Sequence, residues 1–187
     1  RQSLYELSKN SPYQILCATH SPLMIDISQP HSSLIRVVKN TNEETQTYQV
    51  GENLFGRDEE AKKWVQMVNR FNPHICEAFY ADKVLLVEGD TETIVYRDLL
   101  TRFFPDEEIF VLNTGSKMNI PFFQEILTAF HIEHYIIHDS DDKTKKAAWA
   151  INTKIWDNIQ ASNNLSKRYV HIHNFEDAHG IKVKSDD

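Results

Sequence analysis

The sequence predicts an α/β fold with a mainly parallel sheet covered by helices on both faces, and three observations predict it. From residue 83 onward, short apolar segments alternate with longer segments in which apolar residues recur every three or four positions. The segment 83–87 is continuously apolar, as expected of a strand buried on both faces. Acidic residues follow directly after two of the apolar segments, where parallel strands would end.

The expected elements of this region alternate in the order strand and helix. Strands are predicted over 83–87, 109–112, 135–137 and 169–173, and helices over 92–104, 120–130 and 145–159. Helices of this length between strands favour βαβ units and therefore parallel pairing.

The first 80 residues or so follow a different pattern. A helix is expected over 1–10, a short buried strand over 14–19, a hairpin from 34–39 and 45–50, and an amphipathic helix over 58–71. The boundary between the two parts is expected within about residues 72–81. We find no internal repeat and no low-complexity tract.

The composition is that of a globular protein, with 41% hydrophobic and 25% charged residues. No apolar run reaches the roughly 18 residues that a transmembrane helix needs, so no membrane partner is expected. Two cysteines in unrelated contexts fit a reducing cytoplasm better than a disulfide scaffold. The net charge of −7 argues against a simple electrostatic DNA-binding module, but it does not exclude a nuclease, whose metal-binding carboxylates make the chain acidic.

Two acidic motifs stand at the carboxyl ends of predicted strands. In the first, Glu88 ends the strand, Gly89 permits a sharp turn, and Asp90 or Thr91 is expected to cap the helix that contains Glu92. The second motif runs from His138 to Asp142.

Asp139 and Asp141 are two positions apart, so in an extended segment their side chains would project together. Ligands collect beyond the carboxyl ends of the strands in an open α/β sheet, and the two motifs would bring about four carboxylates there. Such a cluster suits hard divalent cations such as Mg²⁺ or Mn²⁺, and two of these ions can hydrolyse a phosphodiester. The alternative for Asp90 is that it only caps the helix, and the alternative for Asp142 is that it is a solvated cap of the helix that follows it.

Glu88-Gly89 followed by Asp139-Ser140-Asp141 resembles Toprim, the catalytic domain of topoisomerases, bacterial primases and several nucleases. The longer motif 87–92, with Glu92, and the segment 114–119 resemble the version found in the OLD (overcoming lysogenization defect) family. The resemblance covers about residues 79–187.

The resemblance implies a nuclease that binds two Mg²⁺ or Mn²⁺ ions and cuts DNA. The implied metal ligands are Glu88, Glu92, Asp139, Asp141 and Glu176. The implied catalytic residues are Glu88, Asp139, Asp141 and Lys117, of which Lys117 would contact a phosphate or be a solvated loop residue. Asp142 and Asn174 are candidate supporting residues, although the family often has a hydroxyl residue near Asn174.

Lys143, Lys145 and Lys146 could neutralise DNA phosphates, or could be ordinary solvated charges on a helix surface. The family also has an important lysine well after the last acid, and Lys182 and Lys184 lie too close to Glu176 to match it. His171 and His173 could suggest zinc, but no cysteine or third histidine has a suitable spacing.

The segment Cys17–Pro22 resembles the last conserved strand of ABC-type ATPases, in which a histidine, here His20, contacts the γ-phosphate of ATP. OLD-family proteins place such an ATPase immediately before Toprim. The expected domains are an ATPase fragment over 1–55, a connecting helix over 56–78 and a Toprim nuclease domain over 79–187. No phosphate-loop motif occurs, so ATP binding is expected only in the intact protein.

The resemblance further implies a homodimer of the intact protein and a role in phage defence, with a helicase partner in Gabija-type systems. Two alternatives remain. One is a topoisomerase or primase, against which the absence of a DNA-binding domain with a nucleophilic tyrosine and the presence of Glu92 argue. The other is a non-catalytic Toprim module for DNA binding or assembly, against which the intact acidic set argues.

Overall fold

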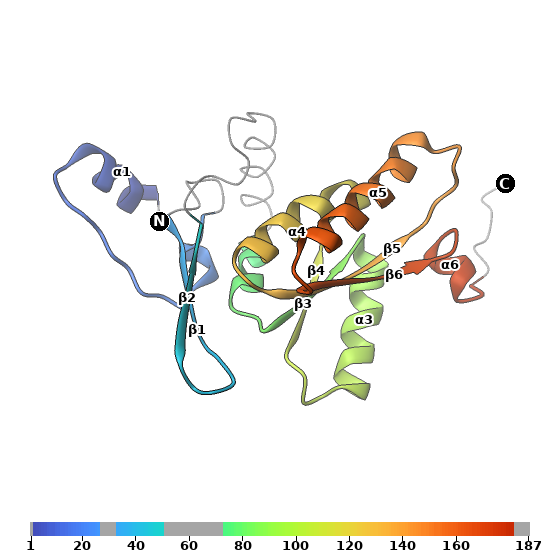
Figure 1. The fold of residues 1–187 in the computed structure, drawn as a ribbon, viewed down its shortest axis with the longest axis horizontal. Coiled ribbons are helices and arrows are strands. Elements are labelled where there is room, and N and C mark those ends of the chain that lie inside the picture. The colour runs from blue at the N-terminus through green and yellow to red at the C-terminus, as the bar shows by residue number, and fades with distance from the viewer. Residues whose placement is uncertain (1, 27–32, 51–72, 182–187) are drawn as a thin grey trace.

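The structure, a computed structural model, describes residues 2–26, 33–50 and 73–181. Within these ranges the chain forms a two-stranded hairpin and a four-stranded sheet with helices on both faces (Figure 1). The predicted α/β fold is therefore confirmed. No helix in the described ranges is long and apolar enough to cross a membrane.

The four-stranded sheet is parallel throughout, with the strand order β4-β3-β5-β6. Its strands are β3 (Lys83–Val87), β4 (Ile109–Asn113), β5 (Glu133–Asp139) and β6 (Ser166–His171). The apolar run in β3 is buried because β3 is a central strand with helices over both faces. Since all four strands run in the same direction, their carboxyl ends lie at one edge of the sheet.

Helices cover the two faces unequally. Helix α3 (Asp90–Phe103) covers one face, and α4 (Ile120–Ala129) and α5 (Lys146–Ala161) lie side by side on the other (Figure 1). The main core lies on the α4 and α5 face, where Ile120, Ile136 and Ile155 are fully buried. A smaller cluster of Leu85, Val87 and Val111 packs beneath α3.

Two local expectations at the ends of these elements are wrong. The N-cap of α3 is Gly89, and Asp90 is the first helical residue, whose Oδ1 accepts a hydrogen bond from Nδ2 of Asn113 at 2.7 Å. The last strand covers 166–171 rather than 169–173, and α6 (Phe175–Ala178) follows it. His173 cannot continue the strand because its φ is +67°, in the left-handed region.

The N-terminal part consists of α1 (Gln2–Asn10), a single-turn 3-10 helix (Pro22–Met24), and the hairpin of β1 (Ile35–Lys39) and β2 (Thr45–Gln49). The helix and the hairpin agree with the prediction. The buried strand predicted over 14–19 is wrong, because residues 13–20 have no regular secondary structure and Leu16 is 91% exposed. In the described part of the chain no strand pairs with this segment, so its apolar run lacks the neighbours that would bury it. The helix predicted over 58–71 lies outside the described residues.

Arg36 of β1 connects the hairpin to the domain with the parallel sheet. Its guanidinium donates hydrogen bonds to the carbonyl oxygens of Phe79, Ala81, Phe130 and His131, at 3.1–3.4 Å. Phe79 ends a 3-10 helix (Pro73–Phe79), and Phe130 and His131 follow the end of α4, where helical carbonyls lack partners within the helix. Tyr48 of β2 stacks on the ring of His131, with the ring centroids 4.6 Å apart. The contacts of this one arginine therefore satisfy carbonyls at two helix ends.

Candidate functional site

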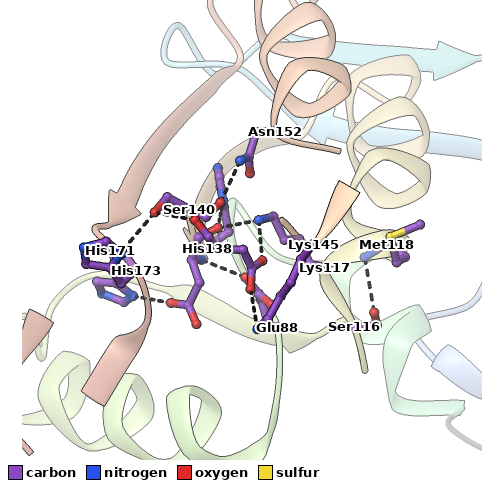
Figure 2. Close-up of polar contacts among 12 residues, drawn as sticks. Glu88, Ser116, Lys117, Met118, His138, Ser140, Lys145, Asn152, His171 and His173 are labelled. Atoms are coloured by element: carbon purple, nitrogen blue, oxygen red, sulfur yellow. Dashed lines mark hydrogen bonds and ion pairs between the residues drawn. The ribbon is translucent and has the colours of Figure 1, made fainter. Parts of the chain in front are cut away.

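The carboxyl edge of the parallel sheet gathers the polar side chains that the sequence singled out. Glu88 follows β3, Lys117 lies four residues after β4, Asp139 ends β5, and His171 ends β6 (Figure 2). Four segments distant in sequence therefore meet at one edge, as the positions of the acidic motifs predicted.

Glu88 and Asp139 are in direct contact through the backbone. Oε1 of Glu88 accepts a hydrogen bond from the backbone N–H of Asp139 at 2.7 Å. Burial raises the pKa of Glu88 to about 7, and the nearby negative charges of Asp139 and Asp141 act in the same direction. Burial also raises the pKa of Asp139. At this edge, therefore, nearby positive charge does not fully stabilise the ionised forms of Glu88 and Asp139.

Asp139 is held by a histidine that reaches it from the neighbouring strand. Oδ1 of Asp139 lies 3.2 Å from Nδ1 of His171, whose Nε2 lies 3.1 Å from the hydroxyl of Tyr96 in α3. An ionised carboxylate only accepts hydrogen bonds, so Nδ1 of His171 carries the proton and Nε2 accepts from Tyr96. Burial raises the pKa of Tyr96 to about 12, which keeps this hydroxyl protonated. His171 itself is 2% exposed, and its ring packs edge-on against Phe175.

Lys117 is a buried lysine with a carboxylate partner. Its Nζ lies 2.8 Å from Oδ2 of Asp141 and also donates to the carbonyl oxygen of Asp139 (Figure 2). The exposed Lys145 reaches Oδ1 of Asp141 at 3.3 Å. Burial alone would raise the pKa of Asp141, but the two ammonium groups lower it below its ordinary value. Lys117 is 4% exposed, so its charge is held in place between β4 and β5.

The turn after β4 explains how a lysine comes to be buried there. Gly115 has a φ of +71°, which a glycine adopts without steric strain. The hydroxyl of Thr114 donates to the carbonyl oxygen of Val87, and Nδ2 of Asn119 donates to the carbonyl oxygen of Thr114. Oγ of Ser116 accepts from the N–H of Met118 and begins a short 3-10 helix (Lys117–Asn119). The segment 114–119 therefore ties the loop to β3 and directs Lys117 towards the edge.

Asp139 and Asp141 do not project together, contrary to the expectation from their spacing. Asp141 has a φ of +59°, so the chain leaves the extended conformation directly after β5. The side chain of Asp139 consequently contacts His171, whereas that of Asp141 contacts Lys117. Oγ of Ser140 accepts from the N–H of His173, which joins this turn to the one after β6.

The remaining predicted residues lie around this centre without joining it. Oε2 of Glu92 lies 3.4 Å from the position that a Cβ on Gly89 would take, so it folds back over the turn after β3. Within the described ranges, the side chain of Glu176 in α6 contacts none of Glu88, Asp139 and Asp141 through a hydrogen bond or through a shared lysine or histidine. Oδ1 of Asp142 accepts from the N–H of Thr144, and Oδ1 of Asn174 caps α6 by accepting from the N–H of Asp177. Asp142 therefore closes a turn and does not cap α5, which begins at Lys146.

The fit of a divalent cation to this edge differs between the acids. No group of three or more His, Cys, Asp or Glu side chains in the described part of the chain is arranged to hold a metal ion. Glu88 and Asp139 nevertheless fit a hard cation, because both offer oxygen atoms and both have a raised pKa that a nearby positive charge would lower. Asp141 already has two ammonium partners. The pair of Glu88 and Asp139 is therefore the part of the acidic set that suits a metal as it stands.

Reasoning from the sequence missed His171 and Tyr96 as partners of the acidic set. His171 stood inside the strand predicted over 169–173 and was considered only for zinc, together with His173; the structure ends this strand at His171 and so brings its ring to the sheet edge beside Asp139. His138 was visible beside Asp139, but its side chain is 1% exposed and burial lowers its pKa to about 4, so it is a neutral packing residue.

His20 lies away from this edge. It is exposed, and its ring centroid lies 6.0 Å from that of Tyr80. The hydroxyl of Tyr80 donates to the carbonyl oxygens of Thr19 and Ser21, at 3.3 and 3.4 Å. These contacts hold the Thr-His-Ser-Pro segment beside the helix that precedes β3.

Comparison with known proteins relates the chain to one family. Residues 79–141 match the family model described as "Overcoming lysogenization defect protein-like, TOPRIM domain". The OLD nuclease of Thermus scotoductus (strain ATCC 700910 / SA-01) is 26% identical over 141 residues, which cover 74% of this chain and 26% of that protein. The chain therefore spans about a quarter of the length of this curated relative, and the similarity is distant. The matched range of the family model contains Glu88, Glu92, Lys117, Asp139 and Asp141, and His171 lies beyond it.

Proposed function

We propose that this chain, whose residues 79–141 form an OLD-like Toprim domain, hydrolyses phosphodiester bonds of DNA with bound Mg²⁺ or Mn²⁺. An OLD-like Toprim domain implies a nuclease-type function. The observation that carries the metal-dependent part is the contact of Glu88 with Asp139, two carboxyl groups of raised pKa, beside the buried ammonium of Lys117. This arrangement suits a site that binds a cation and a phosphate together.

The proposed roles follow from these contacts. Glu88 and Asp139 would hold one cation, and Glu92, Asp141 and Glu176 are proposed as the further ligands of a two-metal site. When bound, such cations supply a water of lowered pKa and stabilise the oxygen that leaves the phosphorus. His171 orients the carboxylate of Asp139, and its hydrogen bond favours the ionised form, against the burial that raises the pKa of Asp139.

Lys117 is proposed to act on the phosphate. Its ammonium lies at the edge with little exposure to water, where a fixed positive charge stabilises an anionic transition state more strongly than it would in solvent. Its contacts with Asp139 and Asp141 hold it in place before a substrate binds. Asp142 and Asn174 shape the neighbouring turns and are proposed to support the site only indirectly.

The N-terminal part is proposed to belong to an ATPase that drives or gates the nuclease in a longer protein. The proposal rests on the Thr19-His20-Ser21-Pro22 motif and on the distant similarity to a nuclease about four times as long as the matched segment. We propose residues 1–55 as the end of that ATPase, 56–78 as a connection and 79–187 as the nuclease domain. In the longer protein His20 would contact ATP, and DNA and a second copy of the protein are the proposed partners.

The test is cleavage of supercoiled plasmid by the full-length protein in the presence of Mg²⁺ or Mn²⁺. Asp139→Asn and Glu88→Gln should each abolish nicking while leaving ATP hydrolysis intact, because the two reactions belong to different domains. A matched control is Asp98→Asn, since Asp98 is an exposed acid of α3 whose only ion pair among the described residues is with Arg102 on the same helix. Full nicking by the Asp139→Asn variant would refute the proposal.

The same experiment separates the alternatives. A topoisomerase would relax the plasmid without leaving a nick and would need a nucleophilic tyrosine from another domain. A non-catalytic Toprim module would bind DNA, but neither the wild-type protein nor any variant would nick it.

A further inference from the structure

We infer that α5 and the adjoining part of β6 form a binding surface for a nucleic-acid strand with unpaired bases, which leads into the site at the sheet edge. We call this surface the α5 ridge, and it consists of Lys143, Lys146, Trp149, Trp156 and Arg168. The inference rests on the proposed function, which makes DNA the substrate, and it adds the surface on which that DNA would bind.

The charge of this region is opposite to that of the chain. Residues 143–168 contain six Lys or Arg residues and one acid, Asp157, so their net charge is +5, whereas the whole chain carries −7. Lys143, Lys146 and Arg168 form no ion pair with a carboxylate of the described ranges. An acidic protein that binds a polyanion needs local positive charge, and uncompensated lysines can displace the counterions of a phosphate backbone.

Two tryptophans interleave with these charges. Trp149 and Trp156 are seven residues apart on α5, which places them on the same face of the helix two turns apart. They are 37% and 45% exposed, although tryptophan is a residue that folded proteins mostly bury. Nζ of Lys143 lies 5.4 Å from the ring centroid of Trp149, and the guanidinium carbon of Arg168 lies 4.6 Å from that of Trp156. Exposed aromatic rings beside cations are typical of surfaces on which nucleic-acid bases stack.

The α5 ridge is continuous with the candidate site. Helix α5 begins five residues after Asp141, and Lys145, directly before it, contacts the carboxylate of Asp141. Asn152, between the two tryptophans on α5, donates from Nδ2 to the carbonyl oxygen of Ser140 at 2.8 Å (Figure 2). The backbone carbonyl oxygen of Asn152 accepts a hydrogen bond from Nη1 of Arg168 at 3.0 Å. These bonds fix the ridge to the turn that carries Asp139 and Asp141.

The tryptophans favour a single strand over a duplex. A base can stack on an indole ring only when its face is free, whereas the bases of an intact duplex are covered by their neighbours. The lysines contact phosphates in either case. The α5 ridge should therefore prefer single-stranded or frayed DNA.

The test measures affinity for oligothymidylate and for a duplex of equal length in the presence of a chelator, because the proposed cleavage needs Mg²⁺ or Mn²⁺. Trp149→Ala and Trp156→Ala should each weaken single-strand binding at least about fivefold, with a smaller effect on the duplex. Wild-type tryptophan fluorescence should be quenched by oligothymidylate, and both substitutions should reduce that quenching. The double variant Lys143→Gln, Lys146→Gln should weaken the binding of both the single strand and the duplex. For the single strand, the slope of the logarithm of the binding constant against the logarithm of the salt concentration should become less steep by about 1.4.

Two controls match these variants. Lys154 lies on α5 but pairs with Glu125 of α4 and is not part of the α5 ridge. Lys154→Gln therefore removes one positive charge from the same helix without changing the ridge. Phe103 is an aromatic residue of α3 that is 67% exposed on the opposite face of the sheet, so Phe103→Ala removes a ring elsewhere. Both control variants should bind DNA as the wild type does.

The inference is overturned if the tryptophan variants bind single strands like the wild type, or if they change only the oligomeric state measured by light scattering. The second result would make the ridge a protein interface. Hydrolysis of the small diester bis(p-nitrophenyl) phosphate tests the proposed function separately, because this substrate does not need the ridge. If the tryptophan variants hydrolyse it normally but bind DNA weakly, both proposals hold. If the wild type binds single strands through the ridge but hydrolyses no diester, only the proposed function fails.

Discussion

Nδ1 of His171 lies 3.2 Å from Oδ1 of Asp139, and the other nitrogen of the same ring lies 3.1 Å from the hydroxyl of Tyr96. The three side chains come from β6, β5 and α3, so this chain of hydrogen bonds crosses from one face of the sheet to its edge. An acid that binds a metal is commonly oriented in this way by a partner that does not touch the ion.

The first prediction concerns this histidine. His171→Ala should lower the affinity for Mn²⁺ by about 10- to 100-fold, because the carboxylate of Asp139 loses its orienting donor. His171→Asn should recover part of the loss, since its amide can donate from near the position of Nδ1. Titration calorimetry with Mn²⁺ measures both values without requiring activity. Unchanged Mn²⁺ affinity in His171→Ala would show that His171 only fills space.

The second prediction concerns the pH dependence that Glu88 produces. Its pKa is about 7 in the folded protein, above the ordinary value of 4.5, so the folded state binds the proton more tightly than the unfolded state does. In metal-free protein this contribution therefore lowers stability as the pH rises from about 4.5 to about 7. Glu88→Gln removes the ionisable group, so the free energy of unfolding should rise by on the order of 1 kcal/mol at about pH 8, a figure already reduced for partial solvation. At about pH 4 the free energy of unfolding should change little.

Thermal unfolding in the presence of a chelator, at several pH values, tests this prediction. The difference between the wild type and Glu88→Gln should grow with pH and then level off above about pH 7. Saturating Mg²⁺ should reduce the difference, because a bound cation compensates the ionised carboxylate of the wild type. A difference that is independent of pH would contradict the raised pKa.

The third prediction concerns the ion pair of Lys117 and Asp141. Lys117→Met should destabilise the protein by about 2 kcal/mol, because it leaves a carboxylate that is 17% exposed with only the solvent-exposed Lys145 as its partner. Adding Asp141→Asn should restore part of that stability, since the unpaired charge is then gone. A double-mutant cycle from urea unfolding gives the coupling energy, and strictly additive effects would show that the two groups do not interact.

The fourth prediction concerns the contact between the hairpin and the parallel-sheet domain. Arg36→Ala should lower the free energy of unfolding by about 2–3 kcal/mol, because carbonyl oxygens after α4 and after the 3-10 helix lose their donor. Hydrogen exchange should then speed up in β1 and β2 more than in β3. Lys39→Ala, in the same strand, is the control and should change neither measurement. Equal exchange rates in the wild type and Arg36→Ala would rule out this role of Arg36.

Sequence patterns were enough to predict the architecture and the sheet edge that carries the site. The continuous apolar run of β3 indicated a strand buried on both faces, and the helix-length segments between the strands favoured parallel pairing. Once the strands are parallel, Glu88 and Asp139 must lie at the same edge, whatever the details of packing. Both features follow from local residue patterns and from the direction of the chain, which are properties of the sequence itself.

Which side chains contact each other at that edge depends on how distant segments pack in three dimensions. Asp139 pairs with His171, 32 positions away, and Lys117 with Asp141, 24 positions away, and neither spacing has a periodicity that sequence patterns reveal. The left-handed backbone at Asp141 separates two acids that their spacing placed together, because the turn also has to hydrogen-bond to the segment after β6. The segment 14–19 shows the same limit, since its apolar run is typical of a strand but only neighbouring strands could have made it one. Side-chain partners and strand pairing depend on contacts between distant segments, and the packing of the whole fold chooses among them.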